Sequence, residues 1–330
     1  MPRQSSASSD APFLYYFDKL LEELHKSTIK ALNDFDAEAI HDARVATRRL
    51  KAALDLAEPV LSDEHSKPLS KALKKLRRTL GPLRDLDVTV GHLDELSANA
   101  RHGAAAAWLR NCLIQRREQK RDKARKNDGA NSMLARLEAW GHVRDELVEA
   151  HDAIDSLLAS SLHLQLDAFS ERVVGIVSDS GPSQDPHEVR IAAKRLRYTL
   201  ELAAAQGHKL PSAILRSFKK MQESLGNWHD WVVLIERAMK TSLDESLPYH
   251  DSRMQEQLLD LCRYLLRRCS RELEHFAKRW RERGEDVTRA IRQTFPLTQP
   301  IIVPQTDRDP GGSGGTPAPA APPPDAVSTA

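Results

Sequence analysis

The stretch IHDARVATRRLKAALDLA, residues 40–57, returns without a gap as PHEVRIAAKRLRYTLELA, residues 186–203. The histidines align, and the basic and leucine positions that follow them align in the same order. A second pair of blocks follows at nearly the same separation: LKKLRRTLGPLRDLDV at 73–88 and FKKMQESLGNWHDWVV at 218–233. Chance similarity does not preserve both order and spacing, so the chain is an internal duplication of two halves of about 150 residues.

The periodicity of the chain predicts an all-α protein. Apolar residues recur every three or four positions from about residue 12 to residue 295, which is typical of one buried helix face. No alternating strand pattern of any length occurs in the sequence. The composition is 40% hydrophobic and 29% charged, with 5% aromatic residues, which disfavours a β-sandwich or barrel.

The helix ends are predicted from prolines, glycines and breaks in periodicity. The first half should form helices near 12–34, 37–60, 63–80 and 84–97, continuing near 104–126 and 132–160. The second should form them near 161–179, 185–206, 209–225, 228–241 and 251–293. Each half repeats a Leu-Gly pair with a following aspartate, as in Gly81 with Asp85 and Gly226 with Asp230. We interpret this motif as a helix stop followed by the acidic first turn of the next helix.

The two ends of the chain differ in composition from its middle. Residues 1–10 are polar and serine-rich, and residues 296–330 are rich in proline, glycine and alanine, so both should be disordered. The part between, 11–295, should divide into repeat one, about 11–160, and repeat two, about 161–295. No apolar run approaches a signal peptide or the ~20 residues of a membrane helix, and three cysteines form no disulfide framework. These features predict a soluble cytoplasmic protein with no membrane partner.

A basic stripe runs along the repeated segment. At about 100° per residue, His41, Arg44, Arg48 and Lys51 share one arc of about 80°, with the leucines on the opposite side. The second copy gives the same stripe with His187, Arg190, Lys194 and Arg197. Like charges at these spacings cost helix stability, so their repetition at matching positions indicates that the charge has a use. Arginine forks and lysine ammonium groups are typical phosphate ligands.

The next helix of each half adds further basic residues. Lys74, Lys75 and Arg78 lie away from the leucine stripe, and their partners in the second half are Lys219, Lys220 and the acidic Glu223. The second half is therefore less basic here. Further basic residues lie off the stripes or at the edge of the pattern, and we rank them lower as candidate ligand contacts: Arg49, Arg195, Lys71, Arg84 and Arg216.

At these residues the sequence resembles the CHAD family, named for a histidine-bearing α-helical domain. The resemblance rests on H-x-x-R-x-x-x-[RK]-[RK]-L-[KR] followed by a basic helix and LG-x-x-x-D, present twice between about residues 12 and 293. It implies two pseudo-symmetric four-helix-bundle repeats packed around a basic groove or pore. It also implies location on polyphosphate granules in some bacteria. The residues that it implies for binding inorganic polyphosphate are those of the two stripes together with Lys74, Lys75, Arg78, Lys219 and Lys220.

The hypothesis that we favour is binding of polyphosphate without catalysis, with no cofactor and no metal. The alternatives are a nucleic-acid-binding protein, in which case nucleic acid competes for the same stripes, and a granule scaffold that contacts other granule proteins. A metal-dependent polyphosphate or triphosphate hydrolase is disfavoured because the sequence has no P-loop, no acidic cluster suited to Mg²⁺ and no E-x-E-x-K signature of a CYTH triphosphatase domain.

Overall fold

The computed structural model describes residues 12–126, 130–137, 140–177, 184–242 and 252–297. Within these ranges every regular element is helical and no strand occurs, so the predicted all-α class is confirmed. The predicted disorder of residues 1–10 and 296–330 lies outside the described residues, apart from residues 296 and 297. The helices are α1 (Pro12–Asn33), α2 (Ala37–Ala57), α3 (Asp63–Ser97), α4 (Gly103–Arg125), α5 (Ala130–Ala135), α6 (Trp140–Glu149), α7 (Ile154–Val177), α8 (Pro186–Ala205), α9 (Ser212–Ser242) and α10 (Ser252–Thr294), with short 3-10 turns at Glu58–Val60 and His151–Ala153.

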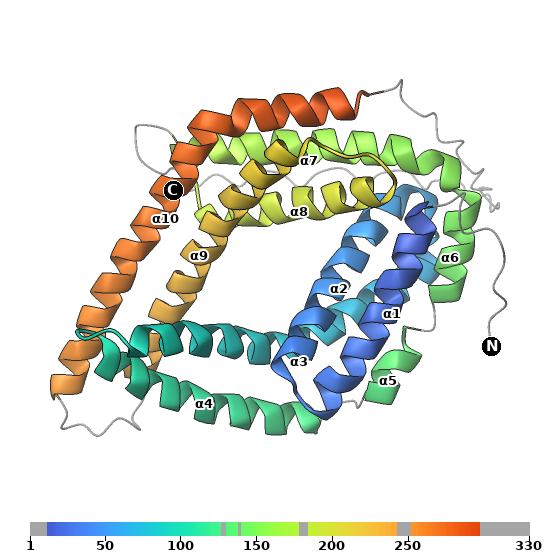
Figure 1. Ribbon diagram of the computed structural model, residues 1–330. Helices are drawn as coiled ribbons and strands as arrows, with labels where there is room; N and C mark the ends of the chain where they lie inside the picture. The colour runs from blue at the N-terminus through green and yellow to red at the C-terminus, as the bar shows by residue number, and fades with distance from the viewer. Residues whose placement is uncertain (1–11, 127–129, 138–139, 178–183, 243–251, 298–330) are drawn as a thin grey trace, which may run out of the picture. The chain divides into compact units, whose positions relative to one another are not determined.

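The long helices pack as consecutive pairs (Figure 1). Helix α1 lies against α2 and α3 against α4, and in the second half α7 lies against α8 and α9 against α10. Helices α5 and α6 lie between the two sets in the sequence. The halves also meet directly, because α2 contacts α8 and α3 contacts α9.

The predicted helix stops at Gly81 and Gly226 are wrong. The segments 63–80 and 84–97 form one helix, α3, and the segments 209–225 and 228–241 form one helix, α9. Positive backbone φ, which a glycine stop commonly uses, is found among the described residues at Phe35 and Gly207. Gly81 and Gly226 therefore lie inside helices, and Asp85 and Asp230 are not in a first turn.

The packing explains why α3 continues through Pro82. A proline inside a helix removes one backbone hydrogen bond and costs about 3 kcal/mol. On both sides of this position the apolar face remains buried, since Leu80, Leu83 and Leu86 are 0–3% exposed. That continuous burial, at about 1.5–3 kcal/mol for each leucine, outweighs the cost of the proline.

The buried residues form two clusters, and neither cluster belongs to one half. The first joins α1, α2 and the start of α3 to α7, α8, the start of α9 and the end of α10. The second joins the rest of α3 and α4 to the rest of α9 and the start of α10. Helix α3 passes from one cluster to the other between Leu83 and Leu86, and α9 passes between Leu225 and Trp231. The misread glycine motif thus marks the crossing between the two cores.

None of the described helices is both long enough and apolar enough to cross a membrane.

Candidate functional site

The two basic stripes begin at aspartate caps. The Asp36 carboxylate accepts a hydrogen bond from the Ala39 N–H at 2.8 Å, and the Asp185 carboxylate accepts one from the His187 N–H at 2.8 Å. Such caps stabilise a helix end by about 1 kcal/mol. They fix where α2 and α8 begin, and so where each stripe faces.

The stripes converge on a cavity of about 270 Å³ between four helices. Helices α2 and α8 supply stripe residues, and α3 and α9 supply residues just beyond the crossing between the cores. Its lining consists of His41, Arg44, Val45, Arg48, Arg84, Asp85, Val88, Thr89, Arg190, Lys194, Gly226, His229, Asp230 and Val233. We call this the inter-repeat cavity.

The lining of the inter-repeat cavity follows the duplication. Arg44 and Arg48 of α2 are the repeat equivalents of Arg190 and Lys194 of α8. Equivalent pairs also line it from α3 and α9: Arg84 with His229, Asp85 with Asp230, and Val88 with Val233. Both halves therefore present corresponding surfaces to one volume.

In the first half, Arg44 is held against α3. Its Nη1 donates to the Arg77 carbonyl oxygen at 3.1 Å, and its Nη2 lies 3.7 Å from Asp85 Oδ1. The side chain is 13% exposed. Burial, followed by the charge of Arg48, lowers the pKa of Arg44, while Asp85 opposes that shift.

In the second half, Arg190 and Lys194 have no ion pair within the described residues. The Arg190 Nε is buried without a hydrogen-bond partner, and burial lowers the pKa of this guanidinium. Burial, then Arg190 and Arg48, lowers the pKa of Lys194 to about 7. A partly buried cation without an ion-pair partner is unfavourable, so this half is electrostatically prepared for an anion.

Burial disfavours the charged form of the two histidines that line the inter-repeat cavity, His41 and His229. Burial, followed by Arg84, lowers the pKa of His41, and burial, followed by Arg190, lowers the pKa of His229 to about 4. His187 does not line the inter-repeat cavity, but its ring lies beside that of His229, with centroids 5.4 Å apart. A neutral imidazole can still donate one hydrogen bond to a phosphate oxygen.

Several predicted residues lie outside the inter-repeat cavity. Lys51 forms an ion pair with Asp55 on its own helix, and Arg197 donates to Glu201 at 2.8 Å. Lys219 lies 3.8 Å from Glu223. Four more predicted residues also do not line the inter-repeat cavity: Lys74, Lys75 and Arg78 of α3, and Lys220 of α9.

The lower-ranked residues separate in the same way. Arg84 lines the inter-repeat cavity, whereas Arg49 donates to Glu201 at 2.8 Å on another side of α2. The remaining ones, Lys71, Arg195 and Arg216, are exposed and do not line it.

Sequence reasoning missed Arg77, His229 and the two aspartates. Asp85 and Asp230 were assigned to helix ends, and His229 was not among the predicted site residues. Arg77 is half-buried, with a pKa lowered by burial and then by Arg48. The signal that could have found the cavity residues is their shared repeat position one turn after the glycine, at 84–85 and 229–230.

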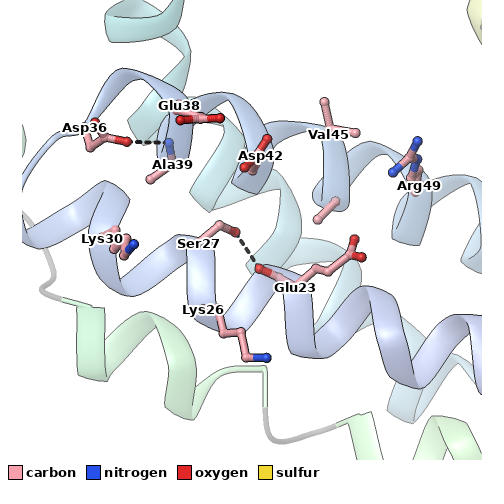
Figure 2. Close-up of a pocket in the computed structure, with 11 residues that line it drawn as sticks. Glu23, Lys26, Ser27, Lys30, Asp36, Glu38, Ala39, Asp42, Val45 and Arg49 are labelled. Atoms are coloured by element: carbon pink, nitrogen blue, oxygen red, sulfur yellow. Dashed lines mark hydrogen bonds between the residues drawn. The ribbon is translucent and has the colours of Figure 1, made fainter.

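A larger hollow of about 520 Å³ lies between α1 and α2, as Figure 2 shows. Its lining mixes Glu23, Asp36, Glu38 and Asp42 with Lys26, Lys30 and Arg49. The Ser27 hydroxyl donates to the Glu23 carbonyl oxygen at 2.7 Å, and Asp36 caps α2. Because carboxylates outnumber cations in this hollow and its polar groups serve the local helices, we assign the candidate site to the smaller, more cationic cavity. Within the described ranges no group of three or more histidine, cysteine, aspartate or glutamate side chains is placed to hold a metal ion.

A family model described as the CHAD domain matches residues 15–239, which include every residue that lines the inter-repeat cavity. The chain belongs to the CHAD family. Among the described residues there is no strand that could carry a CYTH signature.

Two solved structures share the fold of this CHAD protein. One is the CHAD domain from the plant Ricinus communis, with a TM-score of 0.54 and 21% identity, over 87% of this chain and 91% of that one. The other is PptA from Streptomyces chartreusis, with a TM-score of 0.55 and 16% identity, over 82% of this chain and 98% of that one. No curated protein matches the chain.

Proposed function

We propose that this CHAD protein binds inorganic polyphosphate in the inter-repeat cavity without chemical turnover, as a cytoplasmic protein located on polyphosphate granules. The observation that carries the proposal is the convergence of Arg44, Arg48, Arg84, Arg190 and Lys194 on one volume. Four of them, all except Arg44, have no ion pair within the described part of the chain. Membership of the CHAD family, whose resemblance implies polyphosphate binding, supports the same ligand class.

A shared site explains the duplication better than two separate sites. In the proposed complex, two equivalent basic helices, α2 and α8, grip one chain of phosphates from two sides around the basic groove. Arginine forks and the Lys194 ammonium group form charge-assisted hydrogen bonds to the phosphate oxygens. Lys74, Lys75, Arg78, Lys219 and Lys220 extend the positive field beyond the cavity rather than contacting its contents.

Polyphosphate is favoured over nucleic acid because the cavity lining contains no tryptophan, tyrosine or phenylalanine. Single-stranded nucleic acid binding commonly uses such rings to stack the bases. Trp231 is 6% exposed and belongs to the second core cluster, and Trp228 packs against that cluster. Both are therefore engaged in packing with the second core cluster.

The test is a binding titration with long-chain polyphosphate at two salt concentrations, alongside orthophosphate, tripolyphosphate and single-stranded DNA at equal phosphate. We expect tight binding of polyphosphate over DNA, weakened steeply by salt because bound counter-ions are released. Equal and weak binding of all polyanions would overturn the proposal. Release of orthophosphate from polyphosphate in the presence of Mg²⁺ would overturn its non-catalytic part.

A matched pair of variants separates the cavity from general surface charge. Arg190→Glu removes a cation that lines the inter-repeat cavity and should weaken binding by at least about tenfold. Arg289→Glu makes the same charge change on α10, where Arg289 is 56% exposed and pairs with Glu285. Equal losses in both variants would show that net charge alone attracts the polyanion.

A further inference from the structure

The inter-repeat cavity contains two carboxylates whose presence a simple phosphate site does not explain. Asp85 and Asp230 occupy equivalent positions of the two halves and both line the cavity. Each lies well inside a continuous helix, so neither stabilises a helix start. A carboxylate beside a site for anions repels the ligand, and the duplication has kept one in each half.

The two carboxylates are held loosely. The Arg44 Nη2 lies 3.7 Å from Asp85 Oδ1, and the His92 Nε2 lies 3.5 Å from Asp230 Oδ2, both beyond a good hydrogen bond. Arg44 gives its hydrogen bond to the Arg77 carbonyl oxygen instead. The aspartate side chains are 54% and 31% exposed. Within the described residues, neither carboxylate accepts a hydrogen bond that would lock an arginine in place.

The charges nevertheless interact across the cavity. Asp85 opposes the lowering of the pKa of Arg44, Arg190 and Arg237 by burial, which is the largest cause in each case. Asp230 opposes the corresponding shifts of Arg190 and Lys194. Asp85 therefore acts on cations of α2, α8 and α9, and Asp230 acts on two cations of α8.

We propose that Asp85 and Asp230 compete with the ligand for the cavity cations. In the empty protein the two carboxylates partly neutralise these cations, and they thereby set the charge that an anion needs in order to bind. This inference rests on the proposed function. An anion with few charges gains too little from the cations to offset repulsion by the two carboxylates. A long polyphosphate gains enough, because it contacts cations of both halves at once.

The competing explanation is that the aspartates position the arginines. The two explanations predict opposite signs for the neutral, nearly isosteric substitution. Competition predicts that Asp85→Asn and Asp230→Asn each tighten polyphosphate binding by about twofold to fivefold, the upper part of the range for charge coupling at exposed pairs. Positioning predicts weaker binding from either substitution.

The experiment measures the affinity of the full chain for long-chain polyphosphate and tripolyphosphate in the wild type, both single variants and the double variant. The matched control is Asp94→Asn, on the same helix as Asp85 and 52% exposed, which pairs with Arg110 outside the cavity. We expect tighter binding of both anions in the cavity variants, the largest gain in the double variant, and no change in the control. Thermal melting curves verify that each variant is folded.

Weaker or unchanged binding in both single variants would overturn this inference while leaving the proposed function intact. A wild type that does not bind polyphosphate would overturn the proposed function itself. An equal gain in Asp94→Asn would also overturn the inference, because general net charge would then explain the effect.

Discussion

The guanidinium of Arg44 occupies the space above Gly81: a Cβ on that glycine would lie 2.9 Å from Arg44 Nη1. The same arginine donates to the Arg77 carbonyl oxygen, one turn before Gly81 on α3. The absent side chain of residue 81 thus lets α2 and α3 approach closely enough for Arg44 to reach the inter-repeat cavity. In the second half, a Cβ on Gly226 would meet nothing within 4 Å.

Gly81→Ala should weaken polyphosphate binding without unfolding the protein. Alanine is favoured over glycine inside a helix by about 1 kcal/mol, which offsets the cost of moving a flexible arginine tip. We expect the melting temperature to be maintained and the affinity to fall several-fold because Arg44 is displaced. Gly91→Ala, on the exposed side of α3 with nothing within 4 Å of its Cβ, is the control that should leave affinity unchanged. Equal affinities of the two variants would contradict the role given to Gly81.

Arg48 and Lys194 should act on one ligand. They belong to different halves, α2 and α8, and line the same cavity. Reversing either charge, by Arg48→Glu or Lys194→Glu, should weaken binding by more than about tenfold with a single class of sites remaining. Calorimetric stoichiometry makes the check, since two independent sites would instead leave half the sites at full affinity.

The affinity for polyphosphate should depend on pH through Lys194. Its pKa of about 7 in the free protein must rise when an anion neutralises its surroundings of Arg48, Arg190 and Arg197. Binding is therefore strongest below about pH 7, where the amine is already charged. Each pH unit above 7 costs up to about tenfold while the bound amine stays protonated.

Proton uptake makes this pH dependence measurable. Calorimetry at pH 8 in buffers of different ionisation enthalpy should show a proton taken up on binding, and Lys194→Arg should abolish the uptake. The same shift affects stability: a lysine whose folded pKa is lowered costs stability below about pH 7, and the cost disappears as the pH rises toward the usual lysine value. Lys194→Met should therefore stabilise the empty protein most at pH 6.

Glu201 should stabilise the contact between the halves without serving the ligand. Its carboxylate accepts from Arg49 of α2 and from Arg197 of α8, each at 2.8 Å. Glu201→Gln should lower the free energy of unfolding by about 1 kcal/mol, because these groups are partly exposed. Chemical denaturation measures the loss, and polyphosphate affinity should change less than twofold.

The sequence was sufficient for what depends on helix geometry alone. The stripe His41, Arg44 and Arg48 could be predicted to share a face because an α-helix turns by a fixed angle per residue. The last residue of each stripe, Lys51 on α2 and Arg197 on α8, does not line the cavity, because a nearby carboxylate pairs with each of them. The convergence of α2, α3, α8 and α9 depends on packing between distant segments, which helix periodicity does not contain.

The glycine motif was misread for a related reason. Local propensity treats Leu-Gly-Pro as a stop, but burial of Leu80, Leu83 and Leu86 overrides it. Once the helix continues, the aspartate four residues after each glycine faces the cavity instead of a helix end.

The two hydrophobic clusters, each built from both halves, bear on the ancestry of the chain. A polypeptide of one repeat alone would leave one side of both clusters open to water. Burying them would require a second copy, which would also complete the cavity. The forerunner of this protein is accordingly expected to have been a symmetric homodimer, and gene fusion made permanent an association that its cores already demanded.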